Sequence, residues 1–370
     1  MRFIEYSSFS LALISPVLAA VLPSWNSFPG HEPAIDNRTL DEIYAAAQKE
    51  GGVLTVFSGG DEIKQGTSTI AAWEARFPGV KLNLTVDVSK YHDSRIDRQF
   101  EKTGSDGADV AILQTLHDFK RWKEAGRLLP YKPVNWEDIY SSLRDPSGAF
   151  AAISISQFGA LIYNSQLLKA SDVPNSYAEF VDPAWKGKLV LTYPNDDDAV
   201  AYLFSTIINN YGWEWFEALA QQDVQWIRGT GQPSDVVSEG NSSYVLTFTS
   251  NPSGAQNIAS KVLNEPRLLW PQSAAIFAST TKPESAKLFL SWMLSEERQQ
   301  TRASQGLYVP LKSLNSTAGP VWNDLYTGVS QFATFMQDRA SVERWRFQYE
   351  TTIGTAQGVS PVLSVLGSTP

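Results

Sequence analysis

The stretch that decides the fold is V-L-T-V-F-S-G-G-D-E, residues 53–62. Its first five residues form an almost continuous apolar run, which is typical of a strand buried on both faces of a sheet. The glycines and acidic residues that follow predict a tight loop at the carboxyl end of this strand. A helix is predicted immediately before it, over residues 37–50, and Gly51-Gly52 ends that helix.

The same alternation of strand and helix continues along the chain. Strands are predicted over 80–88 and 108–113, with helices between and after them. This β-α-β-α-β order predicts a parallel sheet with helices on both faces. The extended segment 152–164 reads as a strand that crosses into a second α/β unit. The later predictions are strands over 187–193, 224–227, 244–248 and 265–271, and helices over 198–211, 213–221, 234–239, 255–263, 283–304 and 322–349.

Composition excludes several classes of protein. The 370 residues carry 30 Lys+Arg and 39 Asp+Glu, a formal charge of −9, which argues against a nucleic-acid partner. With 43% hydrophobic residues the chain is too apolar to be disordered. Zero cysteines exclude disulfides, thiolate metal sites and cysteine nucleophiles. Because there are only three histidines, we expect no metal site, and no cofactor.

Residues 1–20 predict a secretory signal peptide. Arg2 supplies a positive charge, residues 9–18 an apolar core, and Ala19 and Ala20 a small-residue cleavage site. The alternative is a buried N-terminal helix. A transmembrane helix is not expected, because it needs about 20 apolar residues and this run is shorter. We therefore expect a secreted protein, extracellular, or periplasmic if the source is bacterial. Candidate N-glycosylation triplets that fit a secreted eukaryotic glycoprotein begin at Asn37, Asn83, Asn241 and Asn315.

Several further segments, in order, carry a family resemblance. They are G-A-D-V (107–110), A-G-R-L-L-P-Y (125–131), I-Y-N (162–164), D-P-A-W-K-G-K (182–188) and K-P-E-S-A-K-L-F-L-S-W-M-L-S (282–295). Together with L-T-V-F-S-G-G-D-E, they resemble type II periplasmic solute-binding proteins. The similarity is to the iron(III)/thiamine/polyamine-type binding proteins of ABC importers, and we expect a secreted fungal member.

The resemblance implies an α/β protein with the two-lobed periplasmic-binding-protein-like II fold. Each lobe would hold a mainly parallel sheet flanked by helices, with crossing strands joining the lobes. Lobe 1 would comprise residues 21–155 plus 265–325, and lobe 2 residues 156–264 plus 326–370. The implied partner is a small-molecule or ion ligand held between the lobes without catalysis. A membrane importer is expected only if the host has one, nucleic acid is not expected, and the protein should be a monomer.

Candidate ligand-binding residues follow from the predicted strands. In open α/β sheets, ligands bind outside the carboxyl ends of the strands. One of the candidates, Tyr193, would offer an aromatic ring for a ligand to stack on. The residues at or just after the strand ends are Ser58, Gly59, Gly60, Asp61, Gln114, Thr115, Tyr193, Asp196, Asp197, Arg228, Thr249 and Ser250.

The charges of these candidates leave the solute open. Backbone N–H groups of the loop 58–61 suit an anion or a carbonyl group, whereas Asp61 favours a cation. The run Asp196-Asp197-Asp198 favours a cation such as a thiamine-like molecule, a polyamine or a metal ion, or it caps the next helix. Arg228 would hold a carboxylate or phosphate, or lie in an ordinary turn.

One departure from the family pattern concerns iron. Ferric-ion members carry an adjacent Tyr-Tyr pair about where this chain has only Tyr244, so we predict no iron site. Fungal thiamine-precursor synthases share the lobe architecture but use a cysteine-bearing site, which this chain lacks. An extracellular glycoprotein that kept the fold as an interaction protein is the main alternative. A hydrolase using two carboxylates is the other, although no G-x-S-x-G, H-E-x-x-H or P-loop motif supports one.

Overall fold

The structure is a computed structural model that describes residues 33–314, 319, 322 and 326–364. The predicted signal peptide and the triplet at Asn315 lie outside these residues. Among the helices that the structure describes, none combines the length and the apolar character needed to cross a membrane.

The first lobe is built on a six-stranded sheet. Its order is β3 (Lys81–Asp87), β2 (Val53–Gly59), β4 (Val110–Leu113), β13 (Leu268–Phe277) and β5 (Leu128–Leu129), and β7 (Ala151–Phe158) also pairs with β13. β2 runs parallel to β3 and β4, as the sequence predicts. β13 runs antiparallel to β4, β5 and β7, so the sheet is mixed. The reason is that β13 returns from the second lobe in the opposite direction.

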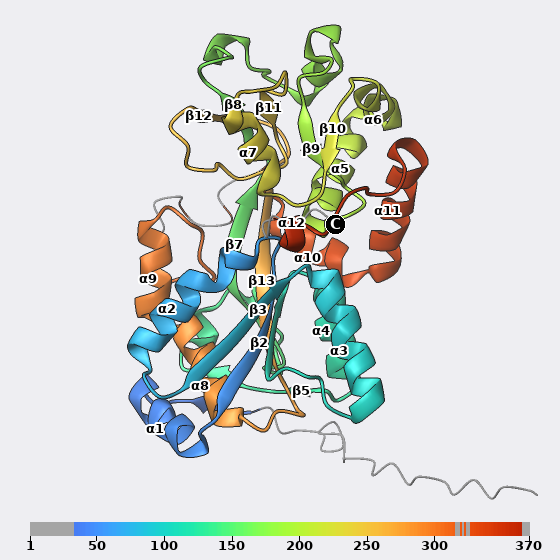
Figure 1. Cartoon of the computed structure of the whole chain (residues 1–370). Helices are drawn as coiled ribbons and strands as arrows, with labels where there is room; N and C mark the ends of the chain where they lie inside the picture. Colours follow the sequence, from blue (N-terminus) through green and yellow to red (C-terminus); the bar gives the residue numbers. More distant parts are fainter. Residues whose placement is uncertain (1–32, 315–318, 320–321, 323–325, 365–370) are drawn as a thin grey trace, which may run out of the picture. The chain divides into compact units, whose positions relative to one another are not determined.

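Helices cover both faces of this sheet (Figure 1). Val56 lies in one apolar core with Trp73 and Phe289, whereas the neighbouring Phe57 packs against the other core. Successive side chains of a strand point to opposite faces, so burial on both faces accounts for the apolar run in β2. The helices on the first lobe are α1 (Leu40–Glu50), α2 (Thr67–Arg76), α3 (Ser89–Thr103), α4 (Leu116–Glu124), α8 (Pro283–Met293) and α9 (Glu296–Ser304); the short strands β1 (Ile35–Asp36) and β6 (Lys132–Pro133) pair with each other.

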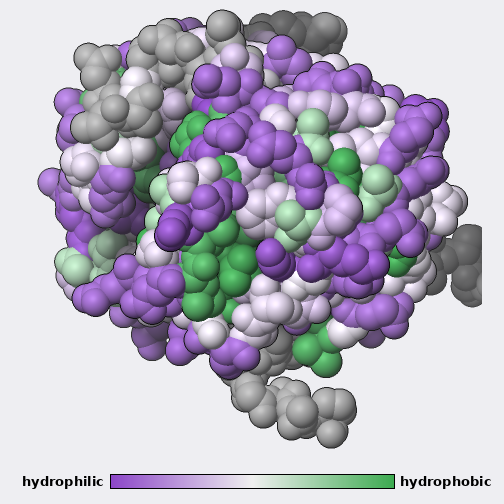
Figure 2. All heavy atoms as spheres, turned by 90° about the horizontal axis from the view of Figure 1, so that it is seen from above, coloured by the Kyte–Doolittle hydropathy of each residue, from purple (hydrophilic) through white to green (hydrophobic). Residues whose placement is uncertain are grey.

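The second lobe contains smaller sheets. β8 (Leu161–Asn164) pairs antiparallel with β11 (Leu246–Thr247) and β12 (Ile258–Lys261), and β9 (Val190–Thr192) pairs parallel with β10 (Gln225–Ile227). Its helices are α5 (Asp198–Tyr211), α6 (Trp213–Ala220) and α7 (Gln232–Glu239), and the chain ends with α10 (Val329–Gln337), α11 (Arg339–Ile353) and α12 (Pro361–Ser364). Seen from above, this end of the molecule is mostly hydrophilic, with smaller apolar areas (Figure 2).

Three predicted helices differ from the structure. The helix predicted over 255–263 is wrong, because residues Ile258–Lys261 form strand β12 against β8. The helix predicted over 283–304 divides into α8 and α9, because the Ser295 hydroxyl accepts a hydrogen bond from the backbone N–H of Arg298 and so begins a new helix. The segment predicted as one helix over 322–349 contains a similar break, where Asp338 caps α11.

Candidate functional site

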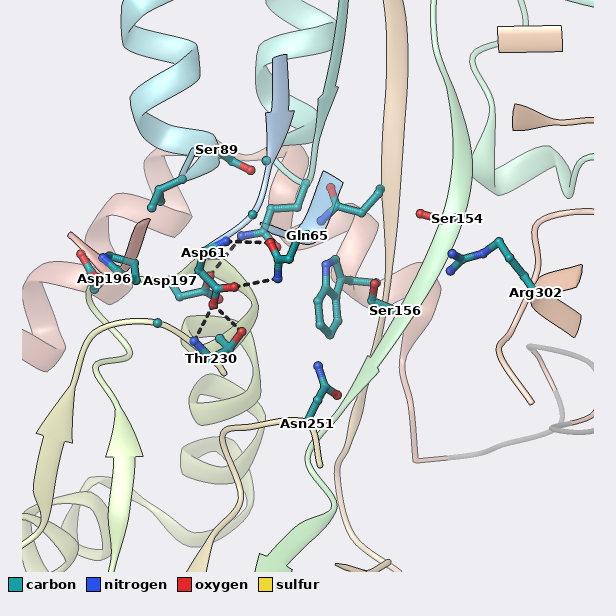
Figure 3. A pocket seen from close by; sticks show the side chains of 18 residues that line it. Asp61, Gln65, Ser89, Ser154, Ser156, Asp196, Asp197, Thr230, Asn251 and Arg302 are labelled. Carbon is teal, nitrogen blue, oxygen red and sulfur yellow. Dashed lines mark hydrogen bonds between the residues drawn. The ribbon is translucent and has the colours of Figure 1, made fainter. Parts of the chain in front are cut away.

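One cavity of about 280 Å³ lies where the ends of strands from both lobes meet. Figure 3 shows Asp61, Asp197 and Thr230 on one side of it, and Ser154 and Arg302 on the other. Its lining is mostly polar: Gly59, Gly60, Asp61, Gln65, Val88, Ser89, Gln114, Ser154, Ser156, Asp196, Asp197, Gly229, Thr230, Asn251, Trp270, Gln272, Arg302 and Pro361. The structure therefore brings half of the predicted candidates into one place: Gly59, Gly60, Asp61, Gln114, Asp196 and Asp197.

Gly59, the last residue of β2, and Gly60, the first residue of the following loop, leave no room for a side chain. A Cβ atom on Gly59 would lie 2.2 Å from the Ser89 hydroxyl oxygen. Asp61 follows, and one of its carboxylate oxygens accepts a hydrogen bond from the Gln65 amide at 2.9 Å. The other oxygen accepts two hydrogen bonds from Thr230 of the second lobe, one from the backbone N–H and one from the hydroxyl. Asp61 thus already has partners on both oxygens.

Asp196 is paired with two cations. The Lys90 ammonium lies 2.6 Å from one carboxylate oxygen, and the Arg228 Nε donates to the other at 2.8 Å. Arg228 also donates to the Tyr91 hydroxyl at 2.7 Å. Lys90 and Tyr91 belong to α3, and Asp196 and Arg228 follow strands of the second lobe, so this cluster joins the two lobes. These ion pairs hold the pKa of Asp196 below its ordinary value despite its burial.

Asp197 is the N-cap of α5. One carboxylate oxygen accepts hydrogen bonds from the backbone N–H groups of Ala199 at 2.8 Å and Val200 at 3.0 Å. The Gln114 amide donates to the other oxygen at 3.4 Å. Burial, followed by the neighbouring charge of Asp198, raises the pKa of Asp197 to about 7. Of the two interpretations of the run 196–198, the structure confirms that Asp197 caps the next helix.

The six other candidates do not line the cavity; they are Ser58, Thr115, Tyr193, Arg228, Thr249 and Ser250. Two of them fix the loops of the second lobe. The Thr249 hydroxyl accepts from the backbone N–H of Thr192 at 2.7 Å, and the Ser250 hydroxyl donates to the carbonyl of Thr230 at 2.6 Å. Tyr193 packs on Trp226, with 6.0 Å between ring centres. Ser58 lies in β2 next to its last residue, Gly59, and Thr115 is buried at the start of α4.

Sequence reasoning missed the wall formed by β7 and β13. Ser156 pairs with Trp270, and Ser154 with Gln272, so the four side chains form two neighbouring cross-strand pairs beside the cavity. The alternation I-S-I-S at 153–156 is the signal that could have found the serines, because alternate residues of a strand share a face. Arg302, in the last turn of α9, completes this wall.

A separate group of side chains has the donors of a metal site. Asp93, His117 and Asp118 offer ligand atoms that all lie within 4.8 Å of one another. Arg121 and Arg339, however, form ion pairs with both carboxylates. The group therefore already has positive partners, and it lies apart from the residues that line the cavity.

The comparison with known families decides what kind of protein carries this cavity. The model of bacterial extracellular solute-binding proteins matches residues 106–324, more than half of the chain. The chain belongs to this family. A search of curated proteins found no match.

Solved structures show that this solute-binding protein has the two-lobed periplasmic-binding-protein fold. Iron-bound HitA of Pseudomonas aeruginosa is 20% identical with a TM-score of 0.62, over 80% of this chain and 99% of HitA. AfuA of Actinobacillus pleuropneumoniae, solved with fructose-6-phosphate bound, is 19% identical with a TM-score of 0.67, over 82% and 99%. The substrate-binding protein of an ABC transporter from Agrobacterium tumefaciens is 13% identical with a TM-score of 0.68, over 82% and 94%.

Proposed function

We propose that this protein binds a small polar solute in the cavity between its lobes, outside the cell, and releases it chemically unchanged. The observation that carries the proposal is the cavity itself, which combines amide, hydroxyl, carboxylate and guanidinium groups from both lobes. Sites for drug-sized ligands measure about 300–1,000 Å³, so a cavity of about 280 Å³ suits a smaller molecule.

The predicted site residues divide into two proposed roles. Gly59, Gly60, Asp61, Gln114, Asp196 and Asp197 would contact the solute, and Ser58, Thr115, Tyr193, Arg228, Thr249 and Ser250 would hold the surrounding loops. Residues Gln65, Thr230 and Asn251 join the first group, because their side chains line the same cavity. The lobe boundaries given above belong to the same proposal, as does closure of the lobes around the solute.

The contacts of the carboxylates bear on the class of solute. The sequence suggested a cation as one class, held by Asp61 and the run from Asp196. In the structure, Asp196 pairs with Lys90 and Arg228, and Asp61 accepts hydrogen bonds on both oxygens. A polyamine would compete with these partners, so we favour a neutral or anionic solute. Of the ligands named for the solved structures, a sugar phosphate suits this lining better than iron, since no tyrosine or histidine is among the described lining residues.

A thermal-melt screen of the purified, chelator-treated protein tests the proposal. The panel would contain sugars, sugar phosphates, amino acids, hydroxy acids, thiamine, polyamines, phosphate, sulfate and iron(III). A ligand at a hundred times its dissociation constant stabilises by about 2.7 kcal/mol, which raises the melting temperature of a chain this long by about 4 °C. A shift with one chemical class is the expected result. No shift with any class would contradict the proposal and favour an interaction protein of the same fold.

The setting of this function is also proposed. We infer that the protein is a secreted monomer, glycosylated in a eukaryotic host, which would deliver its solute to a membrane importer only where the host has one. Size-exclusion chromatography with light scattering on protein collected from a culture medium would test the monomer and the secretion together.

A further inference from the structure

The wall formed by β7, β13 and α9 contains buried polar atoms without partners. Trp270 is only 8% exposed. Among the residues that the structure describes, its indole N–H, the side-chain oxygen of Gln272 and the Nε of Arg302 have no hydrogen-bond partner. All three residues line the cavity. A buried polar group that makes no hydrogen bond costs about 1–3 kcal/mol. Because these three atoms are covered, a solute gains this free energy when the side chains turn toward it.

Arg302 differs from the other arginines near the cleft. Arg228 and Arg346 both pair with carboxylates, whereas Arg302 has no carboxylate partner among the described residues. Its guanidinium donates a long hydrogen bond, 3.4 Å, to the backbone carbonyl of Ile155. Burial and the nearby charge of Arg298 lower its pKa, as expected for a cation that no anion compensates. Figure 3 shows the guanidinium directed toward Ser154.

The charge on the opposite side of the cavity depends on Asp197. The three lining carboxylates of Asp61, Asp196 and Asp197 lie with two cations, Lys90 and Arg228, so that side is neutral when Asp197 is protonated and carries one negative charge when it is ionised. Lys90 and Arg228 are already engaged with Asp196, which leaves Arg302 as the cation that is available to a solute. The raised pKa of Asp197 further reduces the negative charge near neutral pH.

We propose that the solute of this cavity is a hydroxylated oxoanion, a sugar phosphate or a hydroxy acid. Its phosphate or carboxylate is held by the guanidinium of Arg302 and the indole N–H of Trp270, and the hydroxyls of Ser154 and Ser156 lie beside them. Its own hydroxyl groups face the amides of Gln65 and Gln114 on the other side. The inference rests on the proposed function, because it assigns a solute class to the same cavity. Charged hydrogen bonds from arginine to an oxoanion are among the strongest available to a protein.

Calorimetric titration with a matched pair of probes, glucose 6-phosphate and glucose, tests this assignment. We expect the phosphate ester to bind at least about tenfold more tightly than glucose to the wild type, and Arg302→Gln to abolish that preference. Trp270→Phe, which keeps an aromatic ring and removes the N–H, should weaken the phosphate ester several-fold. Arg298→Gln is the matched control, because Arg298 also has no carboxylate partner in the part of the chain that the structure describes, but does not line the cavity.

Two outcomes would overturn the assignment while leaving solute binding intact. One is equal affinity for the two probes; the other is a phosphate preference that survives Arg302→Gln. If no compound shifts the melting temperature in the thermal screen, the proposed function fails, and an NMR titration with inorganic phosphate at millimolar concentration, which detects binding too weak to move the melting temperature, decides the subsite alone. The indole N–H signal of Trp270, identified by its loss in Trp270→Phe, should then still shift in the NMR spectrum of the wild type and stay unmoved in Arg302→Gln. An unmoved wild-type signal would end the assignment.

Discussion

Asp61 and Thr230 contact each other across the cleft, although 169 residues separate them in the chain. The Asp61 carboxylate accepts hydrogen bonds from both the backbone N–H and the hydroxyl of Thr230. Because the two residues belong to different lobes, this contact stabilises the arrangement in which the lobes meet. The sequence predicted Asp61 as a ligand for a cation, whereas in the structure its carboxylate connects the two lobes.

Removing the Thr230 hydroxyl should favour opening of the lobes. Thr230→Val keeps the shape of the side chain and deletes one hydrogen bond to a charged acceptor, worth about 1.5–3 kcal/mol. We expect a larger radius of gyration in small-angle scattering of the ligand-free variant. Thr206→Val is the control, because the Thr206 hydroxyl donates within its own helix, to Leu203. Identical scattering from the Thr230 variant and the wild type would contradict the role given to this contact.

Replacing Asp196 should destabilise the protein through the charges left behind. Its side chain is only 7% exposed, and Asp196→Asn leaves Lys90 and Arg228 without their carboxylate. We expect the free energy of unfolding, measured with urea, to fall by about 3 kcal/mol. Asp41→Asn removes a 78% exposed partner of Arg76 and should change the stability within experimental error. Equal effects of the two substitutions would mean that the cleft ion pairs behave as surface pairs.

Asp197 should make stability fall as the pH rises. Its pKa is about 7 in the folded protein and 3.8 ordinarily, so between these values the folded state binds more protons than the unfolded state. Its contribution is therefore most favourable below the window and is lost as the pH rises through it. Asn carries no charge and still caps a helix, so Asp197→Asn should lose less stability than the wild type between about pH 5 and about pH 7.5.

The comparison with Asp197→Asn is needed because other groups titrate in the same range. Asp93 has a pKa raised to about 6, mainly by burial, which gives the same sign. His92 has a pKa lowered to about 4 by burial, which gives the opposite sign. Asp93 and His92 are present in both proteins, so their contributions drop out of the difference between the two plots of unfolding free energy, measured with urea, against pH. Parallel profiles would show that Asp197 is ionised throughout.

Three of the candidate glycosylation sites are on the surface. Asn37, Asn83 and Asn241 are all exposed, and Asn241 contacts Glu239. We expect each to accept a glycan when the chain is secreted from a eukaryotic host. Endoglycosidase treatment should increase gel mobility, and each substitution by Gln should reduce the size of that shift by one step. A band that does not respond to the enzyme would remove glycosylation from the proposal.

Local patterns account for what the sequence could predict. The buried strand at 53–57 and the helix that ends at Gly51 depend on neighbouring residues, and both appear in the structure at close to their predicted positions. Gly59, Gly60, Asp61 and Gln114 could be selected because they directly follow or end strands. The helix predicted over 255–263 failed because pairing with β8, whose residues lie far away in the chain, determines its conformation.

The contacts of the charged residues could not be predicted in the same way. Lys90 and Asp196 are 106 residues apart, and nothing local to either indicates that they form an ion pair. Arg302 lies in a polar helix, and the sequence does not indicate which of its side chains meets the cavity. The proposed class of solute therefore changed once the partners of each carboxylate were known, whereas the location of the site stays a prediction, with half of its residues lining one cavity.

In the paired strands β7 and β13, side chains that pack in the core alternate with side chains that line the cavity. Ile153, Ile155 and Leu269 belong to the apolar core, while Ser154, Ser156 and Gln272 meet the cavity. Substitutions at the second set change the groups offered to a solute without removing side chains from the core. A lineage that inherits this ribbon can therefore acquire a new ligand preference at little risk to folding, and a protein engineer can randomise those few codons for the same purpose.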